Sequence, residues 1–147
     1  MVRSNGRPAV VLLVEDDPDD RELTSRALQE DFVMTDLHIV SDGEAAMEYL
    51  LQRGAYSPDT APRPDLILLD LNLPKLNGHQ ILERVRAHPV LKGTPVIVLT
   101  TSSQQEDIVR SYDLGCNSFL TKPVEIETFI KAVRAFGKYW FELVALP

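Results

Sequence analysis

Short apolar runs alternate with longer amphipathic segments along most of the chain. The runs cover residues 9–14, 37–40, 66–69, 96–99 and 118–121. Continuous apolar runs without strict alternation are typical of strands buried on both faces, as in a parallel sheet. The segments between them carry apolar residues at helical spacing, such as Ala46, Met47 and Leu50. The pattern predicts an α/β protein of (βα)5 type, with a doubly wound, five-stranded parallel sheet and helices on both faces.

Polar residues predict where several helices begin. Asp17 suits the N-cap of a helix that opens with Pro18. Asp19 and Asp20 then fall in the first turn, where the helix dipole favours negative charge. Two other starts have the spacing of a capping box, Ser41 with Glu44 and Ser103 with Glu106. Residues 54–65 contain one glycine and three prolines and predict a long loop.

Length and charge restrict the function classes. The 147 residues suit one domain, and the single cysteine, Cys116, allows no intramolecular disulfide. Fifteen basic residues against 22 acidic ones give a formal charge of −7, which argues against nucleic acid or an anionic membrane as the main partner. No stretch is long and apolar enough for a membrane span, and residues 1–8 lack a signal-peptide core. We therefore expect a cytoplasmic protein.

Chemically useful side chains follow four of the predicted strands. Glu15 and Asp16 follow the first, Asp70 the third, Thr100 the fourth and Lys122 the fifth. In open α/β sheets, ligands bind beyond the carboxyl ends of the strands, so we expect these groups to meet. Carboxylates about 4 Å apart repel by about 4 kcal/mol at an effective dielectric near 20, and a cation relieves this. A set of oxygen ligands without His or Cys favours a hard ion, Mg²⁺ above all.

The same groups suit phosphoryl transfer to a carboxylate. Asp70 would act as the nucleophile and form an aspartyl phosphate. Mg²⁺ and Lys122 would stabilise charge on the phosphoryl oxygens, and the Thr100 hydroxyl could donate a hydrogen bond to one of them.

These motifs resemble a family. VLLVEDD after the first strand, LILLD at the third, VLTTS at the fourth and the Lys122-Pro123 step resemble a response regulator receiver domain. The resemblance covers residues 9–136 and implies the flavodoxin-like receiver fold. Residues 137–147 would form a C-terminal extension.

The resemblance assigns roles to individual residues. Asp70 matches the phosphoacceptor, and Glu15 and Asp16 match the acidic pair, of which Asp16 is expected to contact the metal directly. Asn72 matches the position whose backbone carbonyl is a metal ligand.

Further positions match the switch of the family. Thr100 matches the switch hydroxyl and Phe119 the aromatic residue whose ring turns inward when that hydroxyl is drawn to the phosphoryl group. Lys122 matches the phosphate-binding lysine, and Pro123 a proline usually preceded by a cis peptide bond. Thr101 stands where the family often has alanine.

A narrower resemblance concerns the kinase partner. The motifs VEDDPDDREL and DLNLPKLNGHQIL, the insertion at 54–65 and the ending YWFELVALP resemble the stand-alone regulators of bacterial and cyanobacterial phytochrome histidine kinases. The resemblance implies phosphorylation by such a sensor histidine kinase. We expect no output domain after Pro147, and the expected output is therefore contact with another protein or onward phosphotransfer.

The segment 136–147 allows two interpretations. Its apolar and aromatic side chains, among them Tyr139, Trp140 and Phe141, could pack back on the same domain. The interpretation we favour is a homodimer contact, because aromatic-rich surfaces are common at interfaces.

Three alternative functions fit the same pattern less well. A Mg²⁺-dependent phosphatase with an aspartate nucleophile usually needs an acid two residues later, where this chain has Asn72. A flavin or dinucleotide domain needs a glycine-rich loop after the first strand, where this chain has EDDPDD. A receiver that cannot be phosphorylated would lack part of the residue set. We therefore expect a signalling module rather than an enzyme.

Overall fold

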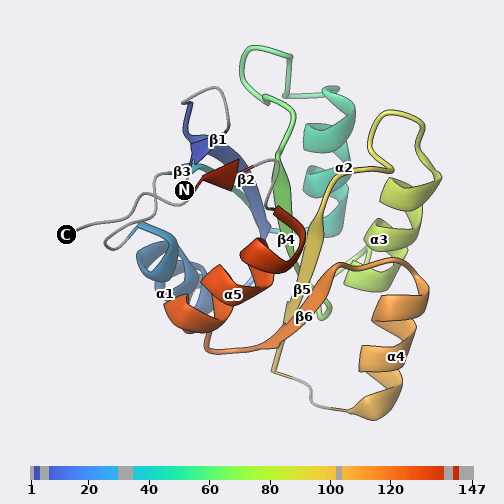
Figure 1. Cartoon of the computed structure of the whole chain (residues 1–147). Helices are drawn as coiled ribbons and strands as arrows, with labels where there is room; N and C mark the ends of the chain where they lie inside the picture. The colour runs from blue at the N-terminus through green and yellow to red at the C-terminus, as the bar shows by residue number, and fades with distance from the viewer. Residues whose placement is uncertain (1, 4–6, 30–34, 102–103, 138–140, 143–147) are drawn as a thin grey trace.

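Five parallel strands form the central sheet of the computed structural model, which describes residues 2–3, 7–29, 35–101, 104–137 and 141–142 (Figure 1). The strands are β2 (Ala9–Val14), β3 (Thr35–Val40), β4 (Leu66–Asp70), β5 (Val96–Thr100) and β6 (Ser118–Thr121). Their order is β3-β2-β4-β5-β6, and all neighbours run parallel. The predicted doubly wound sheet is therefore confirmed, with a β3 that begins two residues earlier than expected.

Five helices cover both faces of this sheet. They are α1 (Pro18–Gln29), α2 (Gly43–Leu51), α3 (Gly78–Ala87), α4 (Gln105–Asp113) and α5 (Ile126–Gly137). Figure 1 shows α1 and α5 on one side of the sheet and α2, α3 and α4 on the other. This arrangement matches the right-handed crossovers that parallel strands require.

The strands divide their side chains between two buried clusters. In β2, Val11 and Leu13 pack with Phe129 of α5, whereas Leu12 and Val14 pack in the cluster of α2 and α3. Because successive side chains of a strand point to opposite faces, a continuous apolar run fills both clusters at once. The apolar runs are therefore uninterrupted because the central strands have no solvent-facing side.

The helix starts differ from the sequence prediction at two places. Asp17 caps α1 as expected, since its Oδ1 accepts from Asp19 N at 2.8 Å and Asp20 N at 3.2 Å. At α2 the predicted capping box of Ser41 is wrong: Asp42 is the N-cap and accepts from Ala45 N at 2.7 Å. An ionised carboxylate complements the positive helix end better than a hydroxyl does, which favours Asp42.

The second difference concerns α4. Gln104 is the N-cap, and the helix begins at Gln105, so the predicted capping box of Ser103 with Glu106 is wrong. Ser103 itself lies outside the described residues.

Hydrogen bonds hold the long connection between α2 and β4 against the domain. The Tyr49 hydroxyl donates to the carbonyl oxygen of Pro62 at 2.8 Å, and Gln52 Nε2 donates to that of Ala61 at 2.9 Å. From the other direction, Arg63 Nη1 donates to the carbonyl oxygen of Leu50 at 2.6 Å. The predicted loop is thus present and is anchored on α2.

Two short strands bring the ends of the chain together. β1 (Val2–Arg3) pairs antiparallel with β7 (Phe141–Glu142), with Val2 opposite Glu142. Figure 1 shows this pair beside the edge of the sheet that carries β3. The sequence did not predict this pairing. Among the residues described, no helix is long and apolar enough to cross a bilayer.

Candidate functional site

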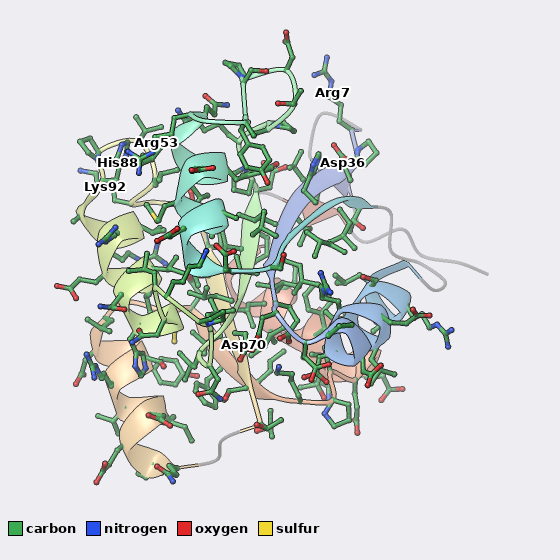
Figure 2. The ribbon with its side chains drawn as sticks, turned by 180° about the vertical axis from the view of Figure 1, so that it is seen from behind. Arg7, Asp36, Arg53, Asp70, His88 and Lys92 are labelled. Carbon is green, nitrogen blue, oxygen red and sulfur yellow. The ribbon has the colours of Figure 1, made fainter. Side chains whose placement is uncertain are left out.

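Strand register brings the predicted site residues to one edge of the sheet. Val14 pairs with Leu69, so Glu15 and Asp70 follow at the same level on adjacent strands. On the other side, Asp70 pairs with Leu99, next to Thr100. Figure 2 places Asp70 well away from the labelled Arg53, His88 and Lys92, toward the other end of the molecule. The parallel sheet thus aligns groups that are up to 107 residues apart in the sequence.

Backbone hydrogen bonds extend this alignment beyond the strand ends. Glu15 N donates to the carbonyl oxygen of Val40 at 3.0 Å, and Lys122 N donates to that of Thr100 at 2.8 Å. The side chains of Glu15 and Lys122 therefore start from fixed backbone positions.

Three carboxylates form a compact group at this edge. One oxygen from each of Glu15, Asp16 and Asp70 lies within 4.8 Å of the others. Glu15 is 0% exposed and Asp70 3% exposed, whereas Asp16 faces solvent. The group therefore combines two buried carboxylates with one that is open to an arriving ion.

The backbone turn after β4 shapes the other side of Asp70. Asn72 N donates to Asp70 Oδ1 at 3.2 Å. Gly78, the first residue of α3, lies so close that a Cβ there would overlap the carbonyl oxygen of Asp70 and the Cα of Leu71. Only glycine permits this close approach of α3 to the end of β4.

Lys122 contacts carboxylates from three elements. Its Nζ donates to Glu15 Oε1 at 2.6 Å and to Asp20 Oδ2 at 2.9 Å, and lies 3.3 Å from Asp70 Oδ2. Its side chain is only 6% exposed. The peptide bond between Lys122 and Pro123 is cis, the geometry that the family resemblance implied.

The ionisation of two of these groups reflects their surroundings. The pKa of Glu15 is raised to about 7, first by burial and then by contact with Asp70, while Lys122 acts in the opposite direction. Burial by itself lowers the pKa of Lys122, but its hydrogen bonds to Glu15 and Asp20 and the charge of Asp70 outweigh this, so the net pKa is raised. The lysine therefore stays charged while the crowded carboxylates repel one another.

This donor set fits a divalent cation. Glu15, Asp16 and Asp70 offer oxygen ligands only, as hard ions such as Mg²⁺ and Mn²⁺ prefer. Asp70 adds to the effect of burial in raising the pKa of Glu15, and a bound cation would offset this repulsion between the two carboxylates. The carboxylates, with the nearby backbone of Asn72, could therefore hold such an ion.

The predicted switch residues occupy different positions relative to this group. Thr100 is 0% exposed, and its Oγ1 accepts from Asn72 Nδ2 at 3.3 Å. Phe119 is partly buried and packs against the cluster of α2 and α3. Thr100 thus belongs to the site, whereas Phe119 lies outside it on β6, the strand next to β5.

Asp20 is a site residue that the sequence analysis missed. We expected only a charge in the first helical turn, but Asp20 Oδ2 hydrogen-bonds Lys122 Nζ. No local signal separates it from Asp19, because both residues suit the first turn of a helix. Only the placement of α1 against the end of β6 reveals the contact.

Comparison with known proteins agrees with this geometry. The model of the response regulator receiver domain family matches residues 11–134. This chain belongs to that family. The response regulator Rcp1 of Synechocystis sp. is 44% identical over 140 residues, which span 95% of this chain and 94% of Rcp1.

Solved structures extend the likeness to three dimensions. The crystal structure of the Mn²⁺-bound form of Rcp1 aligns with a TM-score of 0.75, covering 95% of this receiver domain and 99% of that chain. The bacteriophytochrome response regulator AtBRR is 40% identical, with a TM-score of 0.83 and the same coverages of 95% and 99%. The phosphorylated cyanobacterial phytochrome response regulator RcpA is 40% identical, with a TM-score of 0.75 and coverages of 94% and 99%. The flavodoxin-like receiver fold and the relation to phytochrome response regulators, both predicted from the sequence, are confirmed.

Proposed function

We propose that Asp70 accepts a phosphoryl group from a sensor histidine kinase and that this receiver domain then signals through altered protein contacts. The observation that carries the proposal is the position of the Asp70 carboxylate, 3.3 Å from Lys122 Nζ and inside the group formed with Glu15 and Asp16. A nucleophilic carboxylate beside an ammonium and a candidate cation site is the arrangement that phosphoryl transfer requires.

The proposed step exchanges one bond for another. A carboxylate oxygen of Asp70 attacks phosphorus, and the bond from phosphorus to the phosphohistidine nitrogen of the kinase breaks. The electron pair leaves with that nitrogen, which takes up a proton from solvent. Lys122 then donates a hydrogen bond to a phosphoryl oxygen, and Thr100 donates to another.

We propose Mg²⁺ as the metal, bound by Glu15, Asp16, Asp70 and the backbone carbonyl of Asn72. The ion would neutralise charge that accumulates on the phosphoryl oxygens. The buried Glu15 and Asp70 hold their oxygens in place before the ion arrives, and the exposed Asp16 gives it access.

We propose a phytochrome-type histidine kinase as the partner. We also propose that the phosphoryl transfer takes place in the cytoplasm, where such a kinase would use ATP. Two solved relatives are described as a bacteriophytochrome response regulator and a phytochrome response regulator, and both span nearly all of this chain. Phosphotransfer assays with several purified sensor kinases would test this choice, and we expect the fastest transfer from the phytochrome kinase.

No observation favours the phosphatase alternative. The residue two positions after Asp70 is Asn72, whose amide donates to Thr100 Oγ1 at 3.3 Å. An amide cannot act as a general acid.

Intact mass measurement tests the phosphoacceptor. We expect the wild type, incubated with Mg²⁺ and acetyl phosphate, to gain one phosphoryl group, and the variant Asp70→Asn to gain none. Asp59→Asn, which removes an exposed carboxylate from the long connection, is the matched control and should be modified like the wild type. Modification that persists in Asp70→Asn would overturn the proposal.

A further inference from the structure

The hydrogen bonds of Lys122 are directed away from the proposed phosphoacceptor. Nζ donates to Glu15 at 2.6 Å and to Asp20 at 2.9 Å, while its separation from Asp70 is longer, at 3.3 Å. An ammonium group has three hydrogens, so three close carboxylates occupy its full donor capacity. A phosphoryl oxygen that needs a hydrogen bond from Lys122 must therefore displace one of these partners or weaken its contact.

The three carboxylates differ in how readily they can release the lysine. Glu15 is 0% exposed and makes the shortest contact with Lys122, at 2.6 Å, so water cannot readily replace the ammonium there. Asp70 is the group being modified. The Asp20 side chain is 26% exposed and can exchange the ammonium for water at lower cost.

Asp20 also stands apart from the candidate metal group. That group contains Glu15, Asp16 and Asp70, whereas Asp20 contacts the site through Lys122. A cation bound by these three carboxylates would therefore not displace Asp20 from its hydrogen bond with Lys122.

We propose that Asp20 is a positioning residue that competes with the phosphoryl group for Lys122. In the resting domain, Asp20 holds the ammonium toward α1. In the phosphorylated domain, Lys122 turns to a phosphoryl oxygen and Asp20 becomes hydrated. Asp20 thereby lowers the affinity of the site for its phosphoryl group and shortens the lifetime of the phosphorylated state. This inference rests on the proposed function of Asp70.

Binding of beryllofluoride, which mimics a phosphoryl group on a carboxylate, measures the competition. The Kd is determined by calorimetry in excess Mg²⁺ for the wild type, Asp20→Asn, Asp20→Ala and the control Asp19→Asn. Asp19→Asn removes the same charge from the same exposed turn without touching Lys122. A partly exposed ion pair contributes about 0.2–1 kcal/mol, so we expect both Asp20 variants to bind beryllofluoride about 1.4-fold to fivefold more tightly than Asp19→Asn.

Two further measurements distinguish a failure of the proposed function of Asp70 from a failure of the proposed competition by Asp20. The phosphoryl group formed with acetyl phosphate should persist longer in both Asp20 variants than in the control. Mg²⁺ affinity should shift equally in Asp20→Asn and Asp19→Asn, because each removes one charge from the first turn of α1 and neither residue belongs to the candidate metal group. If the wild type binds no beryllofluoride and gains no phosphoryl group, the proposed function fails. If the wild type does both but the Asp20 variants bind no more tightly than Asp19→Asn, the competition is excluded.

Discussion

Arg86 joins two connections of the fold through neutral acceptors. Its guanidinium donates to the carbonyl oxygens of Gly115 at 2.8 Å, Lys92 at 3.1 Å and Thr94 at 2.6 Å, and to Asn117 Oδ1 at 3.0 Å. The planar guanidinium can serve these separate directions at once, which an ammonium cannot. Arg86 thus ties the connection that precedes β5 to the one that precedes β6.

We expect Arg86→Lys to lower the free energy of unfolding by about 2 kcal/mol or more, because several acceptors lose a charged donor. Urea unfolding followed by circular dichroism measures this loss. Arg84→Lys, on an exposed position of the same helix, should change stability by less than about 0.5 kcal/mol. Equal effects of the two substitutions would show that the hydrogen bonds of Arg86 contribute nothing measurable.

Thr100 provides a second test at the scale of one side chain. Its hydroxyl lies at the site, yet it is not the nucleophile, so Thr100→Ala should still take up one phosphoryl group from acetyl phosphate. Without the hydroxyl, the phosphorylated state should fail to shift the conformation of the domain. Amide hydrogen exchange in α4 and β6, compared before and after beryllofluoride, measures this response. Thr121→Ala, its exposed pairing partner on β6, should respond like the wild type.

Loss of phosphorylation in Thr100→Ala would contradict the assigned role of its hydroxyl. An exchange response equal to that of the wild type would contradict it as well.

The sequence predicted the residues at strand ends because strand order and register determine where they lie. Each of these residues lies at the carboxyl end of a strand or directly after it, and parallel strands bring such positions to one edge; they are Glu15, Asp70, Thr100 and Lys122. Asp20 could not be predicted in the same way. Its contact depends on how far α1 tilts toward β6, and no local residue pattern specifies that distance.

At the scale of elements, one buried contact links α3 with α4. His79 Nε2 lies 3.1 Å from Ser111 Oγ, and that hydroxyl donates to the carbonyl oxygen of Asp107 at 2.8 Å. Since a hydroxyl has a single hydrogen, His79 must be the donor through Nε2–H. Burial lowers the pKa of His79, the positive charge of Arg110 adds to this, and Asp107 opposes it.

The lowered pKa of His79 makes stability depend on pH. The unfolded chain binds a proton near pH 6.5, while the folded domain resists it, so this contribution is complete above pH 6.5 and is lost as the pH falls toward the folded pKa. We expect the free energy of unfolding of the wild type to fall more steeply between pH 7 and 5.5 than that of His79→Gln, by at most about 1.4 kcal/mol per pH unit. Urea unfolding at several pH values measures the slopes.

A His79→Gln slope identical to that of the wild type would show that this histidine titrates alike in both states.

The sequence predicted which helices and strands form better than it predicted the residues at which they begin, and the reason is physical. Ser41 and Asp42 are both good N-cap residues, and only the path of the backbone decides which carboxylate or hydroxyl reaches a free N–H. At α3 the chain uses Asn77 with Gln80 as a capping box, which the sequence analysis did not predict. The short pair of β1 and β7 joins segments that are distant in sequence and too brief to show a period.

At the scale of the whole molecule, the C-terminal segment that follows α5 bears on whether two copies of the chain form a dimer. β7 pairs with β1 within one chain, while the sequence of residues 138–147 is rich in aromatic and apolar side chains. Such a segment favours an interface, and the prediction of a homodimer rests on it.

We expect the full chain to sediment as a dimer and a chain ending at Gly137 to sediment as a monomer, as measured by analytical ultracentrifugation. The shortened chain should still bind beryllofluoride in the presence of Mg²⁺, because the carboxylates of the candidate metal group and Lys122 all lie outside residues 138–147. A monomeric full chain, or a shortened chain that remains dimeric, would exclude this segment as the dimer contact.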